Sequence, residues 1–310
     1  MPCPLVTRRP AASLIELLVV VGVLGVLVGL TASAVQAVRG AAARLSCANN
    51  LRQIAIAAQN YESAHGALPP GYDWWPADRP PAILVPWPLV LLPDLDHGPL
   101  WASARAAYRQ ERYGIRRSPH VGLATVVKVY ACPADGRTAG PITDADGWTA
   151  AYLSYAGVAG GGVALNPVNG AARPDGAMGT LKTGTRLTGV TDGTSQTLLY
   201  GERPPGGLRL ANNWYTATLA DPGWQADGYN RGTVLMAQSD EPANVCRPPF
   251  RFGPGRVDNR CDTHHFWSLH PGGANFALCD GSVRFLAYSA ADLLPAMATR
   301  ASGEVVALPD

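Results

Sequence analysis

Five side chains that can bind metal or transfer protons fall within thirteen residues of each other: Asp258, Asp262, His264, His265 and His270. Carboxylate and imidazole groups in such a cluster are typical of transition-metal sites and of acid–base catalysis. Their spacing matches no catalytic pattern, because the chain has neither His-Glu-x-x-His nor Gly-x-Ser-x-Gly. We therefore expect no catalytic residues and predict that the chain is not an enzyme.

Three further carboxylates offer oxygen ligands for calcium. Asp144 and Asp146 stand in Asp-Ala-Asp-Gly, and Asp192 stands in Asp-Gly-Thr. Neither segment completes an EF-hand loop, so an ordinary turn is the first interpretation of each and a calcium site is the alternative. We expect no other cofactor.

Glu202 follows the apolar run Leu198–Tyr200, which predicts that it lies at the end of a strand. We expect its carboxylate to be buried and paired with Arg203 or Arg300. The alternative role, a catalytic acid, lacks a second carboxylate at a predictable distance.

The chain has six cysteines: Cys3, Cys47, Cys132, Cys246, Cys261 and Cys279. Cys246 and Cys261 are near in sequence and flank a loop rich in Pro, Gly and Arg, so we favour a disulfide between them. The other pairings stay open, and an odd number beyond the leader leaves at least one thiol unpaired. Because no Cys-x-x-Cys occurs, we expect no structural zinc knuckle.

These groups are preceded by a membrane-length apolar segment that starts beside a carboxylate. Glu16 is followed by 22 uncharged residues, Leu17 to Val38, and Arg8 and Arg9 stand before it. A charged side chain costs roughly 2.5–3.5 kcal/mol at mid-bilayer, so Glu16 is a functional candidate. An ordinary membrane anchor is one alternative. A signal peptide cut after Ala32-Ser33-Ala34 is the other, although its apolar core would be unusually long.

The helical pattern continues beyond the apolar segment and becomes amphipathic. Leu45, Ala48, Leu51, Ile54 and Tyr61 recur at helical spacing. Gly66 and Pro69-Pro70 then end the helix. The sequence therefore predicts one helix over residues 12–65, with its membrane part at about 14–38.

The sequence predicts one large domain over residues 66–310. We expect its strands to be mainly antiparallel, so that the whole chain belongs to the α+β class. Its 34 glycines and 27 prolines separate short apolar runs, among them 125–130, 197–200 and 233–236. Asp280-Gly281 between two alternating runs predicts a two-residue type I′ hairpin. That turn would pair Phe276 with Phe285 and Leu278 with Val283 on one apolar face.

The N-terminus resembles that of type IV prepilins and type II secretion pseudopilins, which carry a basic leader and Phe-Thr-Leu-Ile-Glu before a long apolar helix. The match at Leu14-Ile15-Glu16 implies a leader of residues 1–11, cut by prepilin peptidase between Ala11 and Ala12, and methylation of the new amine. It also implies that Glu16 pairs with the α-amino group of a neighbouring subunit. Ala11 and Ala12 replace the usual Gly and Phe.

His270, nine intervening residues and Asp280-Gly281 are similar to the motif of a planctomycete family of "prepilin-type processing-associated" proteins. Those proteins join a pilin-like N-terminus to a large domain of unknown function. Further similar segments follow in the same order: Cys47–Ile54, Leu68–Tyr72, Tyr130–Asp135 and Val190–Thr197. The resemblance assigns no chemistry to His270 or Asp280, and we interpret the motif first as a tight turn entering the hairpin.

Together these features predict a single-pass protein of the inner membrane, with its N-terminus cytoplasmic and its large domain outside. We expect a pilin- or pseudopilin-like subunit of a type II secretion or type IV pilus-like filament. Its partners would be prepilin peptidase, other subunits and the membrane. Removing Arg8 and Arg9 leaves 23 basic residues against 23 acidic ones, so no nucleic-acid partner is expected. The alternative is an anchored glycan- or protein-binding protein, for which eight tryptophans could supply a stacking face for sugars. A hydrolase is a third, less favoured alternative.

Overall fold

The structure is a computed structural model. The structure describes residues 14–75, 83–111, 118–143, 147, 149–162, 175–178, 184–206, 213–215, 234–238, 240 and 246–304. The chain divides into two compact units, Met1–Ala42 and Ala43–Asp310.

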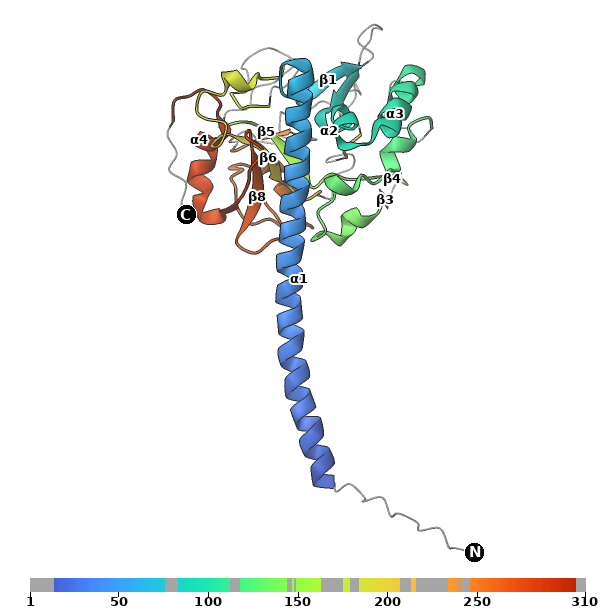
Figure 1. Ribbon diagram of the computed structural model, residues 1–310, viewed down its shortest axis with the longest axis vertical. Coiled ribbons are helices and arrows are strands. Elements are labelled where there is room, and N and C mark those ends of the chain that lie inside the picture. Colours follow the sequence, from blue (N-terminus) through green and yellow to red (C-terminus); the bar gives the residue numbers. More distant parts are fainter. Residues whose placement is uncertain are drawn as a thin grey trace, which may run out of the picture. The chain divides into compact units, whose positions relative to one another are not determined.

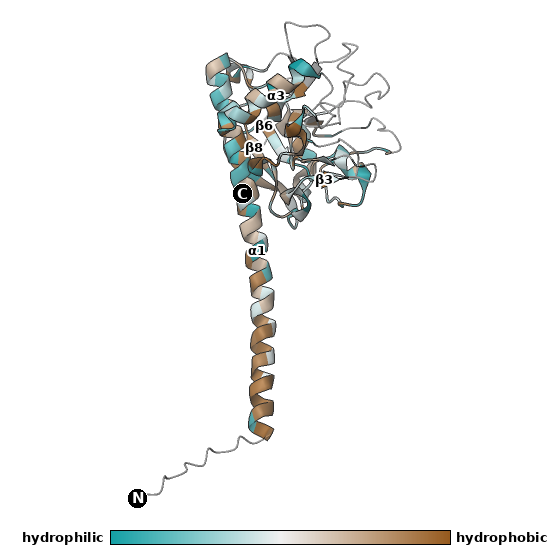
Figure 2. Ribbon diagram, turned by 90° about the vertical axis from the view of Figure 1, so that its right-hand side faces the viewer, coloured by the Kyte–Doolittle hydropathy of each residue, from teal (hydrophilic) through white to brown (hydrophobic). Residues whose placement is uncertain are grey.

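Helix α1 (Leu14–His65) supplies the described part of the first unit and continues into the second (Figure 1). Every described residue from 14 to 42 is exposed, and the helix is hydrophobic over most of this part (Figure 2). Residues 14–38 extend over about 37 Å at ~1.5 Å per residue, enough for a hydrocarbon layer of about 30 Å. Helix α1 is therefore long enough and apolar enough to cross a membrane.

Within the second unit, one face of α1 is buried. Cys47, Leu51, Ile54, Ala55 and Ala58 are fully buried, at the three- and four-residue spacing that places side chains on one helix face. The helix ends where Gly66 adopts a positive φ of 76°, and its N–H donates to the Glu62 carbonyl. The predicted long helix is therefore confirmed over its described length.

A five-stranded sheet forms the centre of the second unit, in the order β7-β5-β6-β8-β9; its strands β5, β6 and β8 are labelled in Figure 1. The strands are β5 (Tyr155–Gly160), β6 (Leu198–Glu202), β7 (Val234–Met236), β8 (Gly273–Leu278) and β9 (Val283–Ala287). All neighbours pair antiparallel except β5 and β7, which are parallel. The predicted α+β class with a mainly antiparallel sheet is confirmed.

Both faces of this sheet are covered. Phe276 and Leu278 of β8 lie in the apolar cluster that contains helix α4 (Leu294–Ala298). Ala277 and Cys279, which point to the opposite face, lie in the cluster that contains the buried face of α1. Because side chains alternate along a strand, a central strand covered on both faces is buried along its whole length, as β8 is.

Smaller elements complete the second unit. They are the hairpin β1 (Tyr72–Trp75) and β2 (Ile83–Pro86), helices α2 (Trp87–Val90) and α3 (Gly98–Gln110), the pair β3 (Ile142–Thr143) and β4 (Thr149–Ala150), and several short 3-10 helices. The apolar run at 125–130 forms no strand, and its second half is a 3-10 helix, Lys128–Tyr130. Backbone carbonyls of the 125–130 segment form separate hydrogen bonds instead of a strand ladder. The Thr125 carbonyl accepts from Trp214 Nε1, and the Tyr130 carbonyl accepts from the Ser154 N–H.

The β8–β9 hairpin forms where the sequence predicts it, but with a different turn. Gly281 has a φ of 83°, whereas Asp280 does not adopt the positive φ that a type I′ turn requires. The Gly281 N–H donates to the Leu278 carbonyl, and the Leu278 N–H donates to the Ser282 carbonyl. This pattern is a three-residue loop with glycine in the left-handed position.

The longer loop shifts the register by one residue. Phe276 faces Arg284 rather than Phe285, and Val283 faces Ala277 rather than Leu278. A one-residue shift exchanges the faces of a strand, so the predicted single apolar face is wrong. The ring of Phe285 instead lies under the Arg44 guanidinium of α1, 4.8 Å from its centre.

Candidate functional site

A group of buried polar side chains lies where β6 ends and β8 begins. Glu202 is the last residue of β6, and His270 stands in the turn before β8. Ser268 fixes this turn, because its Oγ accepts the His270 N–H at 2.9 Å and donates to the Gly273 carbonyl at 2.6 Å. The imidazole is thereby directed at the end of β6.

Glu202 and His270 form a buried pair. His270 Nε2 lies 3.1 Å from Glu202 Oε1, and each side chain is only 2% exposed. Asn275 of β8 also donates to the carboxylate, through its backbone N–H to Oε2 at 2.6 Å and its Nδ2 to Oε1 at 3.0 Å. A buried carboxylate is costly unless it is paired and hydrogen-bonded, and both oxygens of Glu202 meet that requirement.

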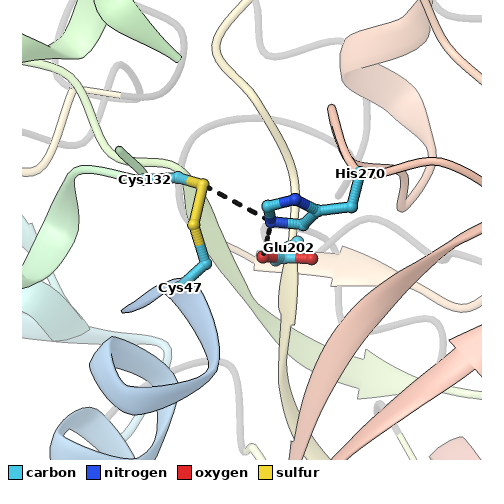
Figure 3. A group of neighbouring side chains, drawn as sticks. All are labelled: Cys47, Cys132, Glu202 and His270. Atoms are coloured by element: carbon cyan, nitrogen blue, oxygen red, sulfur yellow. Dashed lines mark hydrogen bonds and ion pairs between the residues drawn. A yellow bond between two sulfur atoms is a disulfide. The ribbon is translucent and has the colours of Figure 1, made fainter. Parts of the chain in front are cut away.

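A disulfide between Cys47 of α1 and Cys132 lies against the same imidazole (Figure 3). Cys132 Sγ is 3.8 Å from His270 Nε2. One donor atom from each of Cys47, Cys132, Glu202 and His270 lies within 4.8 Å of the others, and all four residues are buried. We refer to these four residues as the buried cluster.

Tyr155 and Asn50 contact the backbone beside the two cysteines, and the Tyr155 hydroxyl donates to the Cys47 carbonyl at 3.4 Å. Burial, and secondarily the charge of Glu202, hold the pKa of Tyr155 well above its ordinary value, so the hydroxyl keeps its proton. Asn50 Nδ2 contacts the Tyr155 hydroxyl at 3.1 Å and donates to the Ala131 carbonyl at 2.9 Å. The contacts on both sides of the disulfide therefore also join α1 to the rest of the domain.

The buried cluster connects segments that are far apart in the sequence. It joins the second half of α1, the segment after the 3-10 helix Lys128–Tyr130, the end of β6 and the turn before β8. Because its side chains are buried, the buried cluster resembles a structural metal site, in which protein side chains fill every coordination position. Catalytic metal sites instead keep one coordination position open. The arrangement can hold a charge pair, a disulfide or an ion in the interior.

The five residues that the sequence groups near His270 do not share one site. Asp258 pairs with Arg256 at 2.7 Å on the surface, and Asp262 pairs with His265 at 3.2 Å. His264 is buried beside Phe250. His270 alone enters the buried cluster.

Glu202 is buried, as expected, but its carboxylate contacts His270 and Asn275. The predicted arginine partners lie elsewhere: Arg203 Nη1 donates to the Thr263 carbonyl, and Arg300 Nη1 donates to the Gly176 carbonyl. Burial lowers the pKa of Arg203 to about 9.

His270 and Asp280 lie at opposite ends of β8. Six residues of strand at ~3.3 Å each separate them by about 20 Å. The Asp280 carboxylate accepts from the N–H and Oγ of Ser282, at 2.9 and 2.6 Å, and so closes the hairpin loop with Gly281. The two ends of the motif therefore have separate structural roles.

Of the calcium candidates, Asp144 and Asp146 lie outside the described residues, as do the processing residues Ala11 and Ala12. Asp192 is described, and its carboxylate accepts the N–H groups of Ser302 and Gly303 at 2.8 Å each. It therefore anchors the segment after α4.

The structure joins Cys246 to Cys261, the pair that the sequence favours, and leaves Cys279 as a buried thiol whose pKa is raised by that burial. Trp87, Trp214 and Trp267 are buried in the core, and Trp101 packs against Arg105. These four tryptophans form no exposed stacking face.

The sequence did not predict the buried cluster as a unit. Cys47 and Cys132 are separated by 85 residues, and Glu202 and His270 by 68. The available signals were the odd cysteine count and the carboxylate at the end of an apolar strand, neither of which identifies a partner.

The family described as "Protein of unknown function (DUF1559)" matches residues 36–293. This range contains all four residues of the buried cluster and begins within the second half of the apolar segment. No curated protein and no solved structure matches the chain. Together with the apolar N-terminal helix, the match indicates a membrane-anchored protein. Because most of its length is matched, the chain belongs to the DUF1559 family of proteins of unknown function.

Proposed function

We propose that this chain is a pilin- or pseudopilin-like structural subunit of a type II secretion or type IV pilus-like assembly, matured by prepilin peptidase. The observation that carries the proposal is the division of α1 into an exposed apolar half and a second half whose one face is buried in the domain core. Such a helix can pack against copies of itself while its other half holds the large domain.

The attachment of α1 to its domain supports a structural role. The Cys47–Cys132 disulfide links the helix covalently to the segment that follows the 3-10 helix Lys128–Tyr130. Gln59, nearer the end of the helix, donates to the Cys279 carbonyl beside the β8–β9 loop at 3.1 Å. A pull on α1 would therefore be transmitted to the central sheet.

The proposed orientation places the second unit outside the cytoplasm. Two disulfides in this unit agree with an oxidising compartment. Arg8 and Arg9 favour a cytoplasmic N-terminus by the positive-inside rule. In this arrangement the chain is a structural subunit without catalytic activity, whose partners are other subunits.

Glu16 tests the assembly step. It lies in the first turn of α1, next to the apolar residues, where the amine of a neighbouring processed subunit would offset the cost of its charge. We expect Glu16→Ala and Glu16→Gln to leave membrane insertion intact and to reduce cross-linking between subunits in vivo at least severalfold.

Glu62→Gln is the matched control, since Glu62 belongs to the same helix but lies beyond its apolar half. Cross-linking should match the wild type in this variant. If Glu16→Gln also cross-links like the wild type, the charge of Glu16 has no part in assembly.

A further inference from the structure

The buried cluster offers the ligands of a zinc site. Two sulfur atoms, one imidazole nitrogen and one carboxylate oxygen lie within 4.8 Å of one another. Zn²⁺ in closed sites takes four ligands in a tetrahedral arrangement, drawn from Cys, His and carboxylate side chains. Thiolate and imidazole together favour zinc over magnesium or calcium, which prefer oxygen ligands.

We propose that Cys47, Cys132, Glu202 and His270 form a redox-dependent zinc site. The site binds no metal while the disulfide is intact and binds Zn²⁺ when the disulfide is reduced. Only thiolate sulfur is an effective ligand, so the disulfide removes half of the ligands. The same four side chains thus hold either a disulfide or a metal ion.

Reduction breaks the Cys47–Cys132 bond and yields two thiols. A dithiol supplies both the two electrons and the two protons and becomes a disulfide. A phosphine supplies the two electrons, while one water molecule supplies the two protons and the oxygen of the phosphine oxide. Zn²⁺ then replaces both thiol protons. Binding should therefore release protons and strengthen as pH rises.

The distances allow this change with small side-chain movements. Zinc bonds of about 2.0–2.3 Å place tetrahedral ligands roughly 3.3–3.8 Å apart. His270 Nε2 is already 3.8 Å from Cys132 Sγ and 3.1 Å from Glu202 Oε1. Reduction breaks the bond between the two sulfur atoms and leaves them free to separate.

Neighbouring groups already orient two of the ligands. Asn275 donates to both oxygens of Glu202, and Ser268 fixes the backbone of His270. Partners of this kind tune metal affinity in known sites. Two thiolates and one carboxylate exceed the charge of Zn²⁺ by one negative charge, and the N–H groups of Asn275 offset part of that excess.

The second disulfide provides an internal comparison. Cys246 and Cys261 pack against Phe250, and no comparable group of ligands surrounds them among the residues with described positions. A site-specific zinc complex should therefore depend on the first pair of cysteines and not on the second.

The experiment uses the full chain in detergent, with Cys3→Ser to remove the leader thiol. The protein is reduced with a phosphine, equilibrated with Zn²⁺ and freed of unbound metal before its zinc is measured. We expect one zinc per reduced chain and none per oxidised chain. With Co²⁺ instead, the reduced chain should show thiolate-to-metal absorption and the intense visible bands of a tetrahedral site.

Cys47→Ser with Cys132→Ser should abolish binding, whereas Cys246→Ser with Cys261→Ser should retain it. Glu202→Gln keeps the shape of the side chain but should weaken zinc binding tenfold or more, given that changes even to outer partners cost about 10–100-fold. Bound metal stabilises the folded state, so a reduced chain that binds no zinc contradicts the proposal whether it stays folded or unfolds. Zinc that persists without Cys47 and Cys132 would also overturn it.

Discussion

Replacing Glu202 with alanine is expected to lower the free energy of unfolding of the second unit by about 3–5 kcal/mol. Glu202 is 1% exposed, and its carboxylate accepts from His270 Nε2 and from both N–H donors of Asn275. Alanine leaves these buried donors without their acceptor and opens a cavity beside the disulfide. Removing one partner of a buried pair costs more than the pair contributes, because the remaining polar groups stay desolvated.

Urea denaturation of the full chain in detergent measures this effect, with fluorescence from the buried Trp87, Trp214 and Trp267 as the signal. Asp258→Ala is the matched control, because it removes an exposed carboxylate that is also paired. Its denaturation midpoint should stay at the wild-type value. A loss below about 1 kcal/mol for Glu202→Ala, as found for exposed pairs, would show that the buried cluster contributes little to stability.

Replacing Cys47 and Cys132 together with serine is expected to cost about 4–5 kcal/mol of stability. The disulfide joins residues 85 apart, and a long closed loop removes much of the conformational entropy of the unfolded chain. The corresponding double variant of Cys246 and Cys261 should cost about 3 kcal/mol, because that pair is separated by only 15 residues.

Thermal unfolding of both double variants in the presence of a chelator gives the comparison without any contribution from metal. The Cys47 and Cys132 variant should also show faster proteolysis, since α1 loses its disulfide cross-link to the segment at Cys132. Equal stability losses in the two variants would mean that loop length does not determine the contribution of these disulfides.

Local patterns were sufficient to predict the long helix and several strands. The spacing of Leu51 and Ile54 predicted the buried face of α1, and Gly66 marked its end. β6, β7 and the β8–β9 hairpin also lie where apolar runs and Asp280-Gly281 placed them. Periodicity identifies these elements because each one buries a face whose repeat is visible within a few residues.

The register and the buried cluster depended on long-range contacts. The turn at Gly281 can close with two or three residues, and the packing of α1 against this loop, through Gln59, is not visible in the sequence. Likewise, nothing near Cys47 indicates Cys132, and nothing near Glu202 indicates His270. These pairs form only when α1, β6 and β8 come together, so the sequence could supply the residues but not their partners.

The mass of the N-terminal peptide, from protein purified out of its native membrane, tests the assignment as a pilin-like subunit most directly. We predict that the mature chain begins at Ala12 and carries a methyl group on its α-amine. A chain that begins at Val35, as after signal peptidase, or that retains Met1 would contradict the assignment.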